Sequence, residues 1–291
     1  MTKVLIDGQE STSLTWDLAG ESGFFDGSRV MTTLQARGSW IVEYERHMTR
    51  LADHAARFGM TKIPAAELIK FEIDSLIQTL KTPEISRVRV ILFNDKAGHQ
   101  HRVVTVASEI FDNGEVMKNG LKLKPVIDKA WPRGSLVKTG QVAAGGSALL
   151  AARATGFDDV LWINSDGEIS ETTWANVFLI GRTGDLVEIA TPPESSGILA
   201  GITRSRITEL LNNAKIPVTE RVITEDEIPR FDEAFVTSSV RGLVPVAAIG
   251  GHRLHTMRSQ AVFHHIARLY NTWLSLGGSS DNRGLRKDKL S

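Results

Sequence analysis

The sequence predicts a mixed α/β (α+β) protein with two domains, and three observations support this class. Strand-like segments with alternating or continuous apolar residues are interspersed with helix-like segments whose apolar residues recur every three or four positions. The chain has 291 residues, which is enough for one large or two medium domains. A polar stretch at 109–119 (EIFDNGEVMKN) carries a turn signal and is expected to be an interdomain linker.

The smaller N-terminal domain is expected over residues 1–108. Its expected strands, in chain order, are 4–6, 30–35, 39–43, 86–94 and 101–107, with a hairpin turn at Arg37-Gly38. Two segments, 46–58 and 64–80, have apolar residues on one helical side, and Gly59 is placed to end the first of these helices.

The larger C-terminal domain is expected over residues 120–276. Its expected strands are 121–126, 159–164, 174–180, 186–190, 216–222, 233–238 and 244–251, with a tight turn at Asp166-Gly167. A helix is expected after Gly145-Gly146, and two further helices are expected at 201–214 and 260–276. The tail 277–291 has almost no apolar content and is expected to be disordered.

Composition excludes several classes of function. Lys+Arg and Asp+Glu both number 34, so the formal net charge is zero and no basic excess indicates nucleic acid. No cysteine is present, which excludes disulfides, thiolate catalysis and cysteine-ligated metals. No apolar run approaches the roughly 20 residues that span a bilayer, and no signal-peptide core is seen at the start. We therefore expect a cytoplasmic protein without a membrane or nucleic-acid partner.

Common motifs of nucleotide, zinc and serine-hydrolase chemistry are absent. The chain has no G-x-x-x-x-G-K-[ST], no G-x-G-x-x-G after a strand, no H-E-x-x-H and no G-x-S-x-G. His264 and His265 are adjacent in the expected closing helix and do not share a helix face, which favours surface or interface histidines. No metal site is expected.

Two segments carry ionisable residues suited to chemistry, although each alone is more often ordinary structure. In LVKTG, Lys138 follows two apolar residues, and partial burial would lower its pKa and favour the neutral amine that forms imines. In DGEISETTWANVFLI, Glu171 follows a short strand, where a carboxylate can keep the nitrogen of a pyridine ring protonated. The alternatives are a solvated loop lysine and a surface glutamate.

Two further segments suit anion binding. In ATPPESSGILAGITRSRITELL, a proline-containing loop leads into a helix at Gly201, so the N–H groups of Ile202 and Thr203 are natural phosphate donors. In FDEAFVTSSVRGLVPV, hydroxyl residues follow a strand, and Arg241 suits bidentate binding of a carboxylate. The alternatives are an ordinary loop-to-helix connection and a polar turn with a solvated arginine.

In their order and spacing these segments resemble the class IV aminotransferases of fold type IV. This family includes branched-chain aminotransferases, D-amino-acid aminotransferases and aminodeoxychorismate lyases. The resemblance covers roughly residues 20–250 and includes ERHMTRLADHAARFGM, which is similar to the family's H-x-x-R-L helix. It implies two α/β domains with pyridoxal 5'-phosphate (PLP) in the cleft between them, and a homodimer.

The resemblance also implies a role for each matching residue. Lys138 would carry PLP as a Schiff base and move the proton during catalysis, and Glu171 would pair with the pyridine nitrogen. The implied cofactor-binding residues are Arg50, Lys138, Glu171, Asn176, Leu199, Ile202, Thr203 and Ser239. Candidate substrate-binding residues are Thr33, Trp174, Ser238 and Arg241.

The expected reaction is transfer of an amino group between a D- or branched-chain amino acid and a 2-keto acid by a ping-pong mechanism. The alternative is an aminodeoxychorismate lyase releasing pyruvate and 4-aminobenzoate, favoured by Thr33 and by the ETTWAN segment. Against the lyase, Ser238 stands where typical lyases have asparagine. A third hypothesis is a catalytically idle PLP-binding protein, and the presence of Lys138 and Glu171 argues against it.

Overall fold

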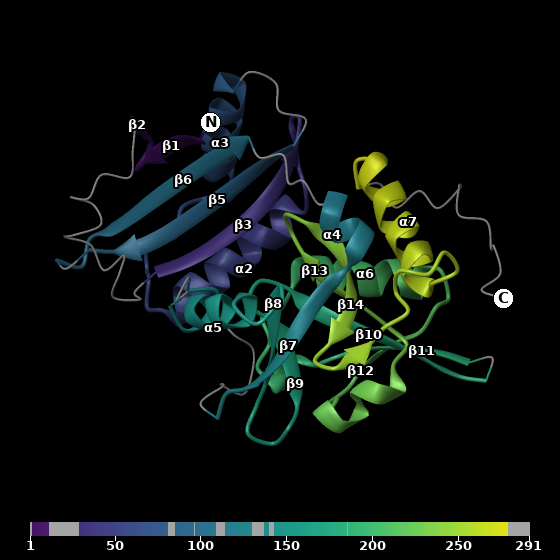
Figure 1. Cartoon of the computed structure of the whole chain (residues 1–291). Coiled ribbons are helices and arrows are strands. Elements are labelled where there is room, and N and C mark those ends of the chain that lie inside the picture. Colours follow the sequence, from purple (N-terminus) through teal and green to yellow (C-terminus); the bar gives the residue numbers. More distant parts are fainter. Residues whose placement is uncertain are drawn as a thin grey trace. The chain divides into compact units, whose positions relative to one another are not determined.

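The computed structural model describes residues 2–11, 29–80, 85–95, 97–108, 114–129, 137–139, 143–184 and 186–278. The chain divides into two compact units, of which the first comprises residues 1–111 and 137–141 and the second residues 112–136 and 142–291. Both units combine helices and strands (Figure 1), which confirms the mixed α/β class.

This division differs from the expected boundary at one place. Residues 137–141 group with the first unit, whereas the sequence-based boundary assigned all of 120–276 to the second domain. The reason is local, because the backbone N–H and C=O of Lys138 both form hydrogen bonds within the first unit.

Two other expected segments are described only in part. Within the expected linker, residues 114–119 form the short helix α4 (Gly114–Asn119), and 109–113 lie outside the described residues. Of the expected disordered tail, Gly277 and Gly278 form a turn after the last helix, and the remainder lies outside the described residues.

The first unit is an antiparallel sheet with two helices on one face (Figure 1). The strand order is β2-β1-β6-β5-β3-β4. Its elements are β1 (Thr2–Ile6), β2 (Gln9–Ser11), β3 (Arg29–Arg37), β4 (Trp40–Ile41), α2 (Tyr44–Arg57), α3 (Ala66–Thr79), β5 (Ile85–Asn94) and β6 (Gln100–Ser108). The predicted hairpin is confirmed, since Ala36 pairs with Ile41 across β3 and β4.

The apolar pattern explains how this unit is built. Val88, Val90 and Val104 are completely buried at alternate strand positions and belong to one core cluster. Leu51 of α2 and Ile73 of α3 join the same cluster and are 2 % and 0 % exposed. Burial of each such side chain contributes about 1.5–3 kcal/mol relative to exposure. Together these contacts fix α2 on the sheet.

Helix α2 ends just before the predicted glycine, with Phe58 as its C-cap. Gly59 has a φ of +71°, a conformation that favours glycine. Its N–H donates to the Ala56 carbonyl, and the Met60 N–H donates to the Ala55 carbonyl. This is the pair of hydrogen bonds of a Schellman motif, which satisfies the last carbonyls of a helix.

The second unit is built on a nine-stranded sheet. Its strands are β7 (Leu121–Ile127), β8 (Asp159–Ile163), β9 (Ile169–Thr172), β10 (Asn176–Thr183), β11 (Leu186–Thr191), β12 (Val218–Glu220), β13 (Glu233–Ser238), β14 (Gly242–Ile249) and β15 (His252–Arg253). Its helices besides α4 are α5 (Ala143–Arg153), α6 (Ile202–Asn213), α7 (Val262–Ser275) and the 3-10 turns η1 (Glu194–Ser196) and η2 (Glu225–Arg230).

Part of this sheet closes on itself. The order β10-β13-β14-β7-β8-β9 returns to β10, because Glu171 of β9 pairs with Asn176 of β10. One apolar cluster draws residues from every strand of this ring, among them Val177, Val236 and Val246. On the other side of β10 and β13, Phe178 stacks on Phe235 at 4.8 Å between ring centroids. The ring thus has a filled inside and an outer side that α6 and α7 approach at β13.

A buried glutamate holds α7 on this outer side. Glu233 of β13 is 4 % exposed, and its two carboxylate oxygens accept the N–H groups of Val262 and Phe263, each at 2.9 Å. Residue 261, an alanine, provides no side-chain cap for α7. Glu233 therefore satisfies N–H groups that the first turn of a helix leaves unpaired.

We expect Glu233→Ala to lower the free energy of unfolding by about 1–3 kcal/mol, because two buried donors lose a charged acceptor. Urea denaturation followed by circular dichroism would measure the change. Glu194→Ala, at an exposed glutamate, is the control. An unchanged midpoint for Glu233→Ala would show that the cap contributes nothing to stability.

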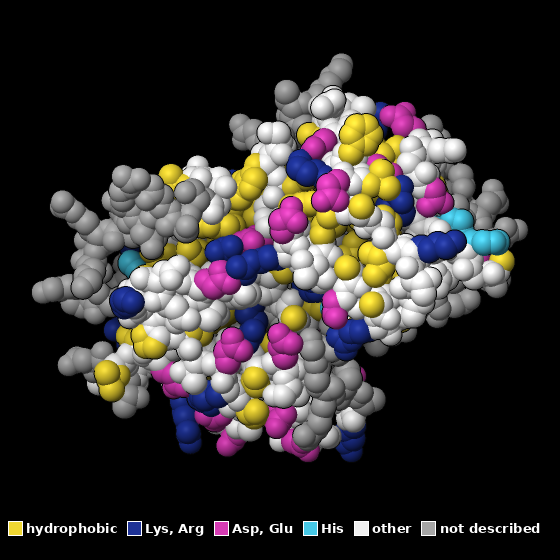
Figure 2. Space-filling model, turned by 180° about the vertical axis from the view of Figure 1, so that it is seen from behind, with side chains coloured by type: hydrophobic (Ala, Val, Ile, Leu, Met, Phe, Trp, Pro, Cys, Tyr) yellow, Lys and Arg dark blue, Asp and Glu magenta, His cyan; other side chains and the backbone are white. Residues whose placement is uncertain are grey.

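Surface charge is mixed. On the face shown in Figure 2, Lys and Arg side chains are interspersed with Asp and Glu, in keeping with the equal numbers of the two types. Among the described residues, no helix is both long enough and apolar enough to cross a membrane.

Candidate functional site

The first unit gathers three ionisable residues on one face of α2. His47, Arg50 and His54 are separated by three and four positions, which places them along one side of a helix. Nδ1 of His47 lies 2.7 Å from the hydroxyl of Thr32 on β3. Arg50 donates to the same hydroxyl at 3.4 Å, so the helix face and the strand are linked.

Lys138 is held against this face by its backbone. Its N–H donates to Nδ1 of His54 at 3.1 Å, and its carbonyl accepts the N–H of Met31 at 2.9 Å. Val137 packs against the core of the first unit, and Arg29 donates to the Thr139 carbonyl at 3.2 Å. The short segment 137–139 is therefore anchored at each of its residues.

Both histidines of this face have a lowered pKa. Burial is the main cause for His47, with the positive charges of Arg50 and Lys138 adding to it, and it places the pKa well below the usual 6.5. Burial also lowers the pKa of His54 to about 4, aided by Arg50 and opposed by Asp53. Both imidazoles are therefore neutral at neutral pH.

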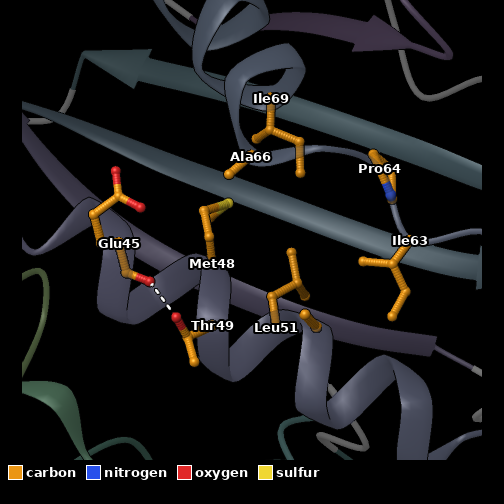
Figure 3. A pocket seen from close by; sticks show the side chains of 9 residues that line it. Glu45, Met48, Thr49, Leu51, Ile63, Pro64, Ala66 and Ile69 are labelled. Atoms are coloured by element: carbon orange, nitrogen blue, oxygen red, sulfur yellow. Dashed lines mark hydrogen bonds between the residues drawn. The ribbon is translucent and has the colours of Figure 1, made fainter.

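A cavity of about 230 Å³ lies on the opposite side of α2 (Figure 3). Helix residues Glu45, Thr49 and Ala52 line it, offset by about half a turn from the face that carries Arg50 and His54. Its remaining lining residues are Met48, Leu51, Ile63, Pro64, Ala66 and Ile69. None of the predicted site residues borders this cavity.

In the second unit, three predicted residues come together. One carboxylate oxygen of Glu171, Oε2, accepts the side-chain N–H of Asn176 at 2.8 Å and the backbone N–H of Leu199 at 3.2 Å. Asn176 also donates to the Leu199 carbonyl at 3.0 Å. These contacts join β9, β10 and the loop before α6, and they orient the glutamate.

The helix expected at 201–214 is present as α6. It begins at Ile202, and no side chain caps it at Gly201. Thr203 is buried in its first turn. A Cβ on Gly201 would lie 1.8 Å from Oδ1 of Asn176, so only glycine permits this close approach. The start of α6 and the hydrogen-bonded group around Glu171 are thus packed against each other through Asn176.

One of the hydroxyl residues expected at the end of this strand, Thr237, lies beside Asn176 in the sheet. Thr237 of β13 pairs with Asn176 of β10, so the two side chains share one face of the sheet. Its hydroxyl is buried and has no hydrogen-bond partner among the described residues. Such a group requires a partner such as a ligand or water. The family resemblance assigns roles to its half-buried neighbours, Ser238 and Ser239, and not to Thr237 itself.

The turn between Glu171 and Asn176 is fixed by two other groups. The Thr172 hydroxyl accepts the Ala175 N–H at 3.1 Å, and Thr173 donates to the buried carboxylate of Asp159 at 2.6 Å. Burial raises the pKa of Asp159, an effect opposed by its hydrogen bonds to the Thr173 hydroxyl and the Val160 N–H. Asp159 was not predicted, and nothing in the local sequence distinguishes it from a strand-end residue.

Two candidate substrate residues lie side by side on the same unit. The guanidinium carbon of Arg241 lies 4.7 Å from the centroid of the Trp174 ring, a cation–π contact. The Arg241 N–H donates to the Ser238 hydroxyl at 3.3 Å. Thr33, the fourth candidate, belongs to the first unit, where it is half-buried on β3.

Each unit thus holds one part of the predicted set. The first contains Thr33, Arg50 and Lys138, and the second contains the remaining predicted site residues. His54 was missed, although its position four residues after Arg50 places it on the same helix face, a signal readable from the sequence.

The residues of the second unit fit a phosphate-bearing pyridine cofactor. A carboxylate oriented by Asn176 suits a ring nitrogen. An uncapped helix start with glycine at its N-cap suits a phosphate group. The buried hydroxyl of Thr237 supplies a further donor on the same sheet face as Asn176.

Comparison with known proteins agrees with this fit. A family model described as amino-transferase class IV matches residues 29–249. A probable branched-chain-amino-acid aminotransferase of Thermotoga maritima is 29% identical over 71% of this chain and 72% of its own. The D-alanine aminotransferase of Bacillus licheniformis is 23% identical over 87% of this chain and 90% of its own.

A solved structure shows the same fold. The branched-chain aminotransferase of Thermoproteus uzoniensis, crystallised with norvaline, superposes with a TM-score of 0.79 at 24% identity. The match covers 96% of each chain.

Proposed function

Because the chain belongs to the class IV aminotransferase family and is a PLP-dependent transaminase, we propose that it exchanges an amino group between a D- or branched-chain amino acid and a 2-keto acid in a ping-pong sequence. The observation that carries this proposal is the network that orients Glu171 through Asn176 and Leu199 beside the uncapped start of α6.

When bound, PLP supplies the electron sink for the pair left on the substrate α-carbon as its proton leaves. Lys138 Nζ holds the cofactor covalently in the resting protein. The free amine of Lys138 would move the proton of the substrate α-carbon, acting as general base and then as general acid. Glu171 keeps the ring nitrogen protonated, and Asn176 holds Glu171 in place.

Four residues are proposed to bind the phosphate. The N–H groups of Ile202 and Thr203 offer the positive end of the α6 dipole. The hydroxyl of Ser239 and the guanidinium of Arg50 add hydrogen bonds and charge, and Leu199 packs against the ring.

Gly201→Ala tests this part of the proposal. Its Cβ would overlap Oδ1 of Asn176, so Asn176 must move and release Glu171. We expect PLP affinity to fall at least about tenfold, a change of 1.4 kcal/mol or more. Gly251→Ala, where a Cβ meets nothing within 4 Å, is the matched control. Equal PLP titration curves for the two variants would contradict the assignment of this loop.

Arg241 supports an amino-acid substrate. A guanidinium binds a carboxylate with two parallel hydrogen bonds, and stacking on Trp174 limits its freedom. Ser238, whose hydroxyl accepts the backbone N–H of Arg241, is a further residue proposed to bind the substrate. The relatives that carry the names branched-chain and D-alanine aminotransferase define the two substrate classes to be tested first.

One observation favours a second candidate function, that of an aminodeoxychorismate lyase. Thr33 lies on β3 two residues from Met31, whose N–H binds the Lys138 carbonyl. Two residues of a strand span about 6–7 Å, so the hydroxyl of Thr33 lies close to the segment that contains Lys138. A lyase would use such a group during elimination of pyruvate.

One spectrum distinguishes the candidates. The purified protein loaded with PLP is mixed separately with D- and L-forms of alanine, leucine and valine. An aminotransferase loses the visible band of bound PLP with one handedness and regains it with a 2-keto acid. A lyase keeps the band and produces 4-aminobenzoate from aminodeoxychorismate. An idle PLP-binding protein does neither, and absence of PLP binding would refute the whole proposal.

We also propose a homodimer, as the family resemblance implies. Light scattering is then expected to give about twice the chain mass of 31.9 kDa.

A further inference from the structure

We propose that His54 is a positioning residue for Lys138, holding the lysine's backbone N–H through Nδ1 and thereby fixing the segment 137–139 on α2. Its effect on turnover rests on the proposed function, whereas the contact itself does not. No part of the family motifs in this chain assigns a role to this position.

One side chain, that of His54, accepts the backbone N–H of Lys138. His54 Nδ1 lies 3.1 Å from the Lys138 nitrogen. The other backbone anchor of Lys138 is the Met31 N–H, a main-chain group of β3. Lys138 is thus held on its carbonyl side by the sheet and on its amide side by a helix side chain. Removal of that side chain frees one side of the residue and leaves the other intact.

His54 is itself rigidly held. It is 2 % exposed, and its helix neighbours Leu51 and Ala55 are 2 % and 0 % exposed within the core of the first unit. Because the ring is fixed in this way, the position of α2 determines the position of the Lys138 backbone. Errors of about 1 Å in the placement of a reacting group can cost 10²-fold in rate, so the backbone anchor matters for a catalytic amine.

The imidazole is in the state this hydrogen bond needs. Only a neutral histidine has a ring nitrogen able to accept, and its proton then resides on Nε2. Burial, aided by the charge of Arg50, lowers the pKa of His54 to about 4, while Asp53 opposes this. At neutral pH the ring therefore accepts from Lys138 without adding a positive charge beside the lysine.

The test compares three variants of the full-length protein. His54→Leu removes the acceptor, His54→Asn keeps one close to the place of Nδ1, and His99→Leu changes a histidine whose side chain is 75% exposed. Should His54→Leu fail to fold, His54→Ala replaces it with less bulk. Exchange of amides in β5 and β6, measured in the same samples, reports whether the fold is intact.

The first readout is hydrogen exchange of the Lys138 amide, by NMR, with and without PLP. We expect exchange to be about tenfold faster in His54→Leu and near the original rate in His54→Asn and His99→Leu. An unchanged Lys138 rate in a folded His54→Leu protein would overturn the proposal. Equally fast exchange in His54→Asn would overturn the acceptor role.

The second readout is the split between kcat and KM. We expect His54→Leu to lower kcat about 10- to 100-fold with little change in the KM for the amino acid, and His54→Asn to restore most of kcat. A kcat unaffected by His54→Leu would overturn positioning. If the original protein transfers no amino group, the proposed function fails, and the exchange readout still decides the contact between His54 and Lys138.

Discussion

Lys138→Ala is expected to abolish amino-group transfer, with kcat at least about 10³-fold lower, since one side chain supplies both covalent attachment and proton transfer. PLP is expected to remain bound more weakly through its phosphate, because the phosphate donors Ile202 and Thr203 belong to a different unit from the lysine. Steady-state assays and PLP titration measure the two effects.

Lys70→Ala is the control for this variant. Lys70 is an exposed lysine of α3 that pairs with Asp74, and its removal should leave kcat unchanged. Normal turnover in Lys138→Ala would refute the assignment of the catalytic lysine. Loss of folding, visible as a lost circular dichroism signal, would instead show that Lys138 is structural.

Glu171→Gln is expected to lower kcat about 10²- to 10³-fold while leaving the site assembled. The glutamine carbonyl can still accept from Asn176 and Leu199, so the local geometry is kept. A neutral amide cannot support a protonated ring nitrogen, and the electron sink is weakened. Assays under saturating substrate, together with the absorbance of bound PLP, measure the loss and confirm occupancy.

Glu194→Gln is the matched control, since this glutamate is exposed and lies in η1 of the same unit. A kcat for Glu171→Gln within about threefold of the original would place the pyridine partner elsewhere, because loss of a preorganised charge at the reacting group costs far more.

Local patterns predicted most of the elements. Apolar residues at alternating positions indicated β5 and β6, and Gly59 indicated the end of α2, because each signal depends on neighbouring residues alone. Closure of the ring in the second unit could not be predicted. It depends on the pairing of Glu171 with Asn176 across a turn whose geometry is set by Thr172 and by Asp159.

The contacts within the candidate site could be predicted only in part, for the same reason. Glu171 and Asn176 were identified from matching motifs, but their hydrogen bonds to Leu199 join residues 28 and 23 positions apart. The grouping of Lys138 with the first unit depends on its hydrogen bonds with Met31 and with His54, the latter 84 positions away. Contacts of this range have no sequence period, so a single sequence contains no direct signal for them.

The central claim is that Lys138 carries the cofactor, and borohydride trapping tests it most directly. The PLP-loaded protein is reduced with sodium borohydride, digested and sequenced by mass spectrometry. The account predicts a phosphopyridoxyl group on Lys138 and on no other lysine. A modified lysine elsewhere, or none despite a visible PLP band, would contradict it.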